Sequence, residues 1–402
     1  MSRLLPFALI VLVACGTDDP ALDATVPDAA VDALVDSTTP EATADVSDTT
    51  DAATEAATDA ARPTVLRVHY PAGTHTVSLR GSLAPLDWTK GLAATKTDPD
   101  TWVFTTEALT TKAEWKPLLD DATWSRGPNY VVEPGTTVDV YPHFTTTKGT
   151  VEKRWTLTSK SLGNTRGVWV YLPPTYLENT TARLPVVYLH DGQNLFDPAL
   201  AFGGNEWKVD ETMDAAAETG KFREAIVVGP ENTARRIYEY TPTKDPGYPD
   251  SGGGALYLSF LIDELKPKVD GELRTLPGRE HTVLMGSSLG GLISSWAGTQ
   301  RADVFGLVGA MSPSTWWDST VLLTMIPASK PPLPLRAYVD SGDSGASSDD
   351  VANTAKLADA YRAKGFVDGK TLEYVVQKGA THSEVYWAQR LPHALEFLLG
   401  PR

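Results

Sequence analysis

Short apolar runs alternate with helical stretches from about residue 151 onward, and this alternation limits the fold more than any other feature of the sequence. The runs end in Gly, Asp, Ser, Pro or Asn and occupy residues 167–174, 184–192, 224–232, 281–288, 307–313, 335–342 and 372–379. Helices are predicted over 206–220, 255–269, 289–300, 350–365 and 383–399. Apolar strands separated by helices indicate a mostly parallel sheet covered on both faces, with ligands at the carboxyl ends of its strands.

The run at 281–288 leads into Gly286-Ser287-Ser288-Leu289-Gly290, a G-x-S-x-G pattern between a predicted strand and a predicted helix. A sharp strand-to-helix turn holds its serine in a strained backbone, and glycines two residues away remove side chains that would collide. Ser288 is the predicted nucleophile. Ser287 is out of register, since the residue two before it is Met285.

A nucleophilic serine needs a histidine base and an acid, in the order Ser, Asp, His for this motif. Only His382 and His393 follow Ser288 in the sequence. His382 lies in a loop after a predicted strand and is the predicted base, whereas His393 lies within the last helix. The strand at 335–342 and the loop after it offer four candidate acids: Asp340, Asp343, Asp349 and Asp350. Asp349 or Asp350 is best placed to face the histidine loop, because both lie just before the next predicted helix. The same cluster could instead bind calcium, although its spacing matches no known ligand loop.

Backbone N–H groups must also hold the oxyanion that forms during acyl transfer. The amide of Leu289 follows the nucleophile and supplies one donor. The loop after the run at 184–192 is predicted to supply the second from Gln193, with Gly192 allowing a close approach. His190 and Asp191 are interpreted as loop structure, because adjacent residues at a strand end point in opposite directions.

Residues 63–144 show short β-type runs about ten residues apart, which predicts a small antiparallel sandwich. The order of Trp88, Lys116, Trp124 and Asn129 resembles a starch-binding carbohydrate module of the immunoglobulin-like type. That resemblance implies tryptophans that stack on sugar rings, while the lysine and the asparagine bond hydroxyls. The alternative is a sandwich without sugar affinity that packs beside the catalytic domain.

The first residues combine one arginine, a short apolar run and Leu12-Val13-Ala14-Cys15. The run is too short to span a bilayer and fits a secretory signal over residues 1–15. Small residues before a cysteine resemble a bacterial lipobox with lipid on Cys15, so we expect a lipid-anchored protein of the cell envelope, on the outer membrane or the periplasmic face. The alternative is an uncleaved signal with an incidental cysteine.

Residues 16–62 are rich in Ala, Thr and Asp, and this composition predicts a disordered acidic tether. The chain carries a net charge of −16, and most of that acidity lies in the tether. The remainder is only mildly acidic, so nucleic acid is not an expected partner. Cys15 is the only cysteine, which excludes an intramolecular disulfide and a cysteine-based metal site.

Several stretches together resemble the putative esterase family of α/β-hydrolases, which includes enterochelin, feruloyl and acetyl-xylan esterases and esterase D. They are VYLPPTY, LPVVYLHDGQNLFD, GGGALYLSFLIDELKP, MGSSLGGLISSWAG, MSPSTWW and GATHSEVYWAQRLPHALEFL. The resemblance covers residues 155–400 and implies an α/β-hydrolase domain over 150–402. It also implies ester hydrolysis through Ser288 and His382, with Asp349 as the acid; the inserted DSGASS departs from the family's usual loop.

We therefore expect a serine carboxylic-ester hydrolase without cofactor or metal, acting on a small-molecule or glycan ester, with siderophore esters as one candidate class. Trp316 and Trp317, together with the loop at 231–240, are candidates to shape the substrate cleft or to pack in the core. Two alternatives remain at this stage: an acyltransferase of the same fold, and a catalytically inactive surface glycan-binding lipoprotein. The sequence predicts no oligomeric state.

Overall fold

The computed structural model describes residues 62–401. The predicted signal segment with Cys15 and the acidic stretch up to residue 61 lie outside the described residues. Within residues 62–401, no helix is both long and apolar enough to cross a bilayer.

Residues 64–140 form nine short strands in two small sheets. One sheet has the order β4-β5-β1-β9, and the other has the order β3-β2-β6-β7 with β8 also paired to β6. All pairs are antiparallel except β1 with β9. Apolar side chains of both sheets, such as Leu66, Leu79 and Trp115, share one core. The strands are β1 (Thr64–His69), β2 (Val77–Gly81), β3 (Leu92–Ala93), β4 (Thr95–Asp98), β5 (Thr101–Thr106), β6 (Ala113–Leu119), β7 (Thr123–Trp124), β8 (Tyr130–Val132) and β9 (Thr137–Val140). An immunoglobulin-like topology for this segment stays a prediction.

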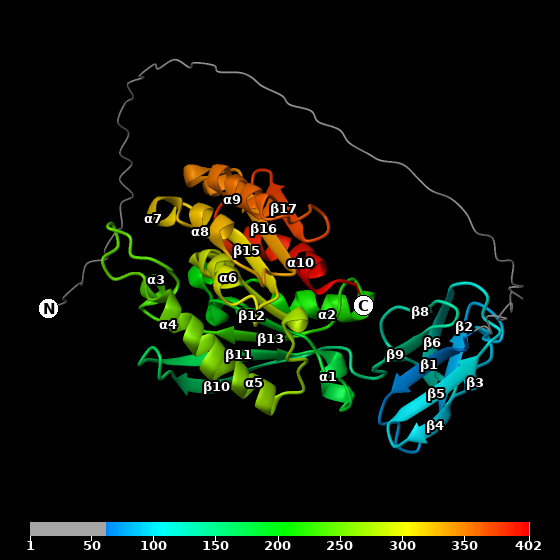
Figure 1. Cartoon of the computed structure of the whole chain (residues 1–402). Coiled ribbons are helices and arrows are strands. Elements are labelled where there is room, and N and C mark those ends of the chain that lie inside the picture. Colours follow the sequence, from blue (N-terminus) through cyan, green and yellow to red (C-terminus); the bar gives the residue numbers. More distant parts are fainter. Residues whose placement is uncertain (1–61, 402) are drawn as a thin grey trace, which may run out of the picture. The chain divides into compact units, whose positions relative to one another are not determined.

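An eight-stranded sheet forms the centre of the remaining chain, in the order β10-β11-β13-β12-β14-β15-β16-β17 (Figure 1). β11 runs antiparallel to both β10 and β13, whereas all pairs from β13 to β17 are parallel. The mostly parallel sheet predicted from the sequence is thus a mixed sheet with an antiparallel edge. Its strands are β10 (Thr150–Thr158), β11 (Thr165–Leu172), β12 (Val186–Leu189), β13 (Ile226–Pro230), β14 (Thr282–Ser288), β15 (Leu307–Pro313), β16 (Arg336–Gly342) and β17 (Leu372–Gln377).

Strand order reverses around β12, because β13 lies on one side of it and β14 on the other. In open sheets of this kind the crevice at such a reversal is the usual ligand site. The loops that follow β12 and β14 therefore meet at one edge, and these loops carry Gln193 and Ser288.

Helices cover both faces of the sheet (Figure 1). The α-helices are α1 (Pro174–Glu178), α2 (Val209–Thr219), α3 (Arg236–Glu239), α4 (Gly254–Ser259), α5 (Lys266–Glu272), α6 (Leu289–Gln300), α7 (Trp317–Thr320), α8 (Leu322–Ala328), α9 (Val351–Ala363) and α10 (Glu384–Leu399). A π-helical segment, η3 (Phe260–Leu265), joins α4 to α5. Short 3₁₀ turns are η1 (Gly192–Asn194), η2 (Phe202–Gly204), η4 (Arg279–His281) and η5 (Ala346–Asp350).

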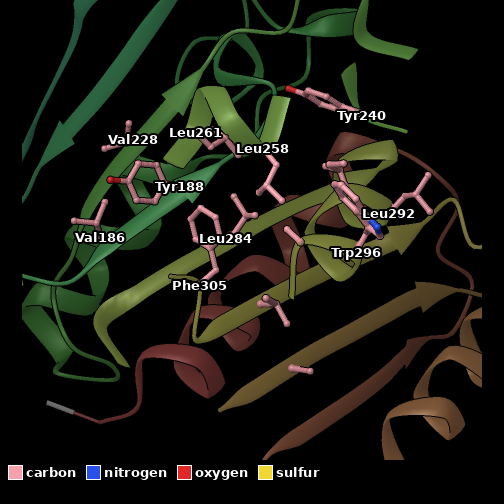
Figure 2. Close-up of a cluster of buried hydrophobic side chains, with 14 of the residues drawn as sticks. Val186, Tyr188, Val228, Tyr240, Leu258, Leu261, Leu284, Leu292, Trp296 and Phe305 are labelled. Carbon is pink, nitrogen blue, oxygen red and sulfur yellow. The ribbon is translucent and has the colours of Figure 1, made fainter. Parts of the chain in front are cut away.

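Alternate residues of each central strand enter opposite cores. Val186 and Tyr188 of β12 face the helices α4 to α6 and α9, whereas Val187 and Leu189 face α2 and α10. Figure 2 shows the first of these cores, where Tyr188 and Leu284 of the sheet pack with Leu258, Leu261, Leu292 and Trp296. Burial on both faces explains why these strands read as unbroken apolar runs in the sequence.

Candidate active site

The predicted strand-to-helix turn is present at Ser288. β14 ends at this residue and α6 begins at Leu289. Ser288 has φ 57° and ψ −122°, a conformation that costs a residue with a side chain about 1–3 kcal/mol. A Cβ at Gly286 would lie 2.8 Å from Cδ2 of His190 and 3.1 Å from the Cα of Gly290. Glycine is therefore required there, as the sequence indicated.

The two serines of the motif differ in environment. Ser287 is buried, and its backbone pairs with Met311 of β15. Ser288 is partly exposed, and its Oγ lies 3.4 Å from Oγ of Ser314. Only Ser288 can therefore present its hydroxyl to a ligand without displacing the core.

His382 and Asp349 form a hydrogen-bonded pair. Nδ1 of His382 lies 2.6 Å from Oδ1 of Asp349, whose side chain is fully buried while that of His382 is 42% exposed. Trp387 packs edge-on against the imidazole, with ring centroids 5.0 Å apart. His393 instead contacts Glu373 of β17 through Nε2 at 3.0 Å. In the part of the chain that the structure describes, no hydrogen bond joins Ser288 to His382. Hydrogen bonds between catalytic groups are often long in the absence of substrate and shorten when it binds.

The carboxylate of Asp349 accepts two further hydrogen bonds. Oδ2 accepts one from Oγ of Ser312 at 2.6 Å and one from the amide of Gly342 at 2.5 Å. Burial alone would raise the pKa of Asp349, but the bonds from His382, Ser312 and Gly342 outweigh it and hold the pKa below its usual value. The ionised carboxylate can only accept, so His382 carries its proton on Nδ1 and leaves Nε2 free to act as a base.

The other carboxylates of the loop have partners of their own. Asp340 is fully buried beside Nε of Arg390 at 2.9 Å. Asp343 accepts from Ser344 and from the amide of Gly379. Asp350 accepts from the amide of Trp316 and from Asn353. With each carboxylate occupied separately, the geometry gives no support to the calcium alternative.

The loop after β12 approaches the next strand closely, as predicted. A Cβ at Gly192 would lie 2.1 Å from the carbonyl oxygen of Gly229, so only glycine fits. The side chain of Gln193 accepts a hydrogen bond from the amide of Asn232 at 3.2 Å. The amide of Leu289 lies in the first turn of α6, where N–H groups have no partner within the helix. Both predicted oxyanion donors thus lie just after the carboxyl ends of the adjacent strands β12 and β14.

His190 and Asp191 point into separate networks. Nδ1 of His190 contacts the hydroxyl of Tyr257, and Nε2 contacts Ser294. Burial lowers the pKa of His190 to about 4, so it is neutral at neutral pH. Asp191 forms a bidentate pair with Arg236 at 2.8 and 2.9 Å. Neither residue is arranged as a catalytic pair, in agreement with the sequence interpretation.

Trp316 and Trp317, the two tryptophans predicted to shape the cleft or to pack in the core, follow Ser314 closely in the sequence. Trp316 is 43% exposed, whereas Trp317 is buried and donates from Nε1 to the carbonyl of Thr243. Tyr248 contacts both rings, with centroids 6.0 and 5.0 Å away. Of the two predicted cleft residues, Trp317 is a core residue and Trp316 remains a candidate for substrate contact.

The four predicted sugar-binding residues all lie in the sheet β3-β2-β6-β7 and its loops. Trp124 is 38% exposed and Trp88 is half-buried, with ring centroids 6.1 Å apart and planes 40° apart. Arg80 lies over the Trp124 ring at 5.2 Å. Lys116 donates to the carbonyl of Gly127, and Asn129 donates to Glu114. Neither tryptophan belongs to the core of the two sheets.

Three carboxylates gather before and at the start of α2. Oxygen atoms of Glu206, Asp210 and Glu211 lie within 4.8 Å of one another. Burial and the charge of Glu211 raise the pKa of Asp210 to about 6. An acidic cluster on its own defines no metal site, and no function is assigned to it.

Ser312, Trp387 and Arg390 lie behind Asp349, and no pattern in the sequence singled them out. Trp387 and Arg390 both donate to Oγ of Ser312, at 3.0 and 2.8 Å. Trp387 and Arg390 lie three residues apart on α10, a spacing that by itself indicates only that both lie on one face of the helix. The contacts among these residues join distant parts of the chain, so no local pattern in the sequence could have identified them.

The mixed eight-stranded sheet, the strained serine at a strand-to-helix turn and the histidine–aspartate pair define an α/β-hydrolase. The family described as "Putative esterase" matches residues 159–398. The chain therefore belongs to the putative esterase family, and it is an esterase.

Similar proteins include both characterised and uncharacterised chains. An uncharacterised protein of Bacillus subtilis, YbbA, is 28% identical over 257 residues, which is 61% of this chain and 96% of that protein. An iron(III) salmochelin esterase of Escherichia coli is 29% identical over 185 residues, 45% of this chain and 40% of that enzyme. A siderophore enterobactin esterase of Emericella nidulans is 33% identical over 156 residues, 34% of this chain and 48% of that enzyme. The chain thus spans less than half of either siderophore esterase.

Among solved structures, a ferulic acid esterase aligns with a TM-score of 0.50 at 23% identity, over 63% of this chain and 98% of that one. At this identity the likeness supports the fold and carries no information about the substrate.

Proposed function

We propose that the chain is a serine carboxylic-ester hydrolase that acts through an acyl-enzyme formed on Ser288. The observation that carries the proposal is the 2.6 Å bond between His382 and buried Asp349, at the same sheet edge as a serine held in a strained turn. In this proposal Ser288 is the nucleophile, His382 is the base and Asp349 is the orienting acid of a catalytic triad.

In the first half-reaction, Nε2 of His382 takes the proton of Ser288 as Oγ attacks the ester carbonyl. The amides of Leu289 and Gln193 hold the resulting oxyanion. The carbon–oxygen bond to the alcohol breaks, and His382 gives its proton to the leaving alkoxide. In the second half-reaction, water gives a proton to His382 and attacks the acyl carbon. The bond between that carbon and Oγ of Ser288 then breaks, and His382 gives its proton to Oγ, which releases the acid and restores both residues. Asp349 stays ionised and stabilises the imidazolium in both steps.

The proposed substrate class is a small-molecule ester, with siderophore and glycan-linked esters as the first candidates. Support comes from the relatives, which include salmochelin and enterobactin esterases and an endo-1,4-β-xylanase/feruloyl esterase. A panel of aryl acetates, feruloylated and acetylated glycans and a catecholate siderophore would rank these candidates by kcat/KM.

The nucleophile is tested by exchanging each serine of the motif. Ser288→Ala should lower hydrolysis of a short aryl ester by several orders of magnitude with an unchanged melting temperature, because no other group can form the acyl-enzyme. Ser287→Ala is the matched control and should keep most activity. Near wild-type turnover by the Ser288 variant would refute the mechanism.

We also propose that the protein is anchored by lipid on Cys15 at the cell envelope, on the basis of residues 12–15 alone. Cys15→Ser should move the protein from the detergent-extracted membrane fraction to a soluble or unprocessed form. Wild-type protein released into the medium without lipid would contradict the anchor.

A further inference from the structure

A second serine, Ser312 of β15, lies next to Asp349. Ser312 is fully buried and has φ 38°, in the left-handed region that residues with side chains seldom adopt. Its Oγ has three polar neighbours: Oδ2 of Asp349 at 2.6 Å, Nη2 of Arg390 at 2.8 Å and Nε1 of Trp387 at 3.0 Å. The strained backbone places this hydroxyl where three side chains meet.

The direction of every hydrogen bond at this hydroxyl is fixed by its partners. Indole and guanidinium N–H groups can only donate, and a hydroxyl has two acceptor positions and one proton. Trp387 and Arg390 fill both acceptor positions. The single proton of Ser312 is therefore left for Asp349, and a hydrogen bond to an ionised acceptor is stronger than a neutral one.

Arg390 is itself held in place by two other polar groups, one fully buried and one half-buried. Its Nε lies 2.9 Å from Oδ2 of Asp340, and its Nη1 donates to Gln377 at 2.9 Å. Asp340 in turn accepts from the hydroxyl of Tyr338 and from the amide of Ser312. The guanidinium thus cannot rotate away from Ser312 without breaking several buried bonds.

The torsion that turns a carboxylate about its own axis has broad minima, so burial alone does not orient Asp349. Ser312 and the amide of Gly342 both donate to Oδ2, and this leaves Oδ1 for His382. We propose that Ser312, with Arg390 and Trp387 as its donors, is a positioning residue that orients the Asp349 carboxylate toward His382. This inference rests on the proposed function and assigns a new role within that site.

A double-mutant cycle tests this role on the full chain. Ser312→Ala should lower kcat for an aryl ester about tenfold, with KM changed less than about twofold. In an Asp349→Ala background the same substitution should lower kcat less than about twofold, because no carboxylate remains to be oriented. Ser295→Ala, at another buried serine, is the control and should leave kcat unchanged in both backgrounds.

If Ser312→Ala lowers kcat by the same factor in both backgrounds, the effect is a general structural one and the proposal is overturned. A wild-type kcat for Ser312→Ala would also overturn it. Trp387→Phe decides the question if Ser312→Ala does not fold. The phenylalanine keeps an aromatic ring against His382 but lacks the N–H group that donates to Ser312. We therefore expect Trp387→Phe to lower kcat a few-fold in the wild-type background and to leave kcat unchanged in the Asp349→Ala background. Wild-type kcat in this variant would then overturn the proposal.

Failure of the proposed function has a different signature. If Ser288→Ala or Asp349→Ala retains wild-type kcat, the triad itself is wrong. If both lower kcat by orders of magnitude, and the Ser312 cycle measured on the residual activity of Asp349→Ala shows no coupling, only the positioning role is wrong.

Discussion

Trp316 and Trp317 are neighbours in the chain, yet they differ in burial and so in the consequences of their loss. Trp317 is 1% exposed and packs with Leu322 and Ile326, whereas Trp316 is 43% exposed. The backbone of Trp316 is anchored by Asp350 and lies two residues after Ser314, whose Oγ contacts Ser288. We propose that the exposed ring contacts the part of the substrate next to the reacting carbonyl.

This contrast gives a paired prediction. Trp316→Ala should raise KM for an aryl ester about two- to tenfold and change KM for an aliphatic ester less, because one aromatic contact contributes about 0.5–1.5 kcal/mol. Trp317→Ala should lower the free energy of unfolding by about 3–5 kcal/mol, as expected for a buried tryptophan. Steady-state kinetics and thermal melts measure the two effects. Identical KM changes for both esters would exclude a specific role for Trp316.

The geometry of the strand-to-helix turn was predictable because it depends on local sequence. Gly286, Ser288 and Gly290 sit within five residues, so the backbone strain and the glycines that allow it could be inferred together. The acid was harder to choose, because Asp349 and Asp350 are adjacent and only the fold decides which one meets His382. The roles of Ser312 and Arg390 could not be predicted, since their contacts join residues 37 to 78 positions apart.

At the scale of elements, α2 shows an electrostatic conflict at its first turn. Asp210 and Glu211 lie where the helix dipole favours negative charge, but Glu206 approaches both. Burial raises the pKa of Asp210 to about 6, so folding favours its protonated form. A raised folded pKa contributes stability that is present at low pH and is lost as the pH rises through about 6.

The contribution of Asp210 to the free energy of unfolding should therefore fall as the pH rises from 4 to 7, and Asp210→Asn should remove that contribution, about 1 kcal/mol after allowance for solvent screening. Denaturant titrations at pH 4, 5, 6 and 7 measure the effect. Asp263→Asn, at an exposed carboxylate on η3, should keep the wild-type dependence. An unchanged pH profile in the Asp210 variant would contradict the prediction.

The predicted helices and central strands are confirmed, because apolar residues dominate each run and turn residues bound it. β10 was missed, since it lies at the sheet edge and its alternating pattern includes Lys153 and Arg154. α8 was also missed, because Pro327 lies inside it. The antiparallel edge of the sheet could not be predicted, because strand order and direction depend on contacts between distant segments.

On the scale of the whole molecule, the eight-stranded sheet brings distant sequence together at one edge. The loops after β12, β14, β16 and β17 supply Gln193, Ser288, Asp349 and His382 in chain order. β12, β14 and β16 are buried on both faces, whereas β17 is a partly buried edge strand. We therefore expect the proposed site to tolerate the inserted residues 343–348, because the strands rather than the loop lengths set the positions of its groups.

Residues 64–140 carry a separate surface that the catalytic site does not use. Trp88 and Trp124 lie side by side outside the core, with Arg80 against the second ring. Trp88 is half-buried and Trp124 is 38% exposed, so solvent reaches part of both rings. We propose that this pair is a sugar platform, as the resemblance to a starch-binding module implied.

The full chain should then bind insoluble α-glucan, and Trp88→Ala or Trp124→Ala should weaken binding roughly three- to tenfold per ring without lowering the melting temperature. Ser288→Ala is the control, because it should abolish hydrolysis and leave glucan binding intact. Sedimentation with the polysaccharide and thermal melts measure the two properties. The platform is excluded if the wild-type chain does not bind the glucan. It is also excluded if either tryptophan variant loses the several kcal/mol of unfolding free energy expected for a core residue.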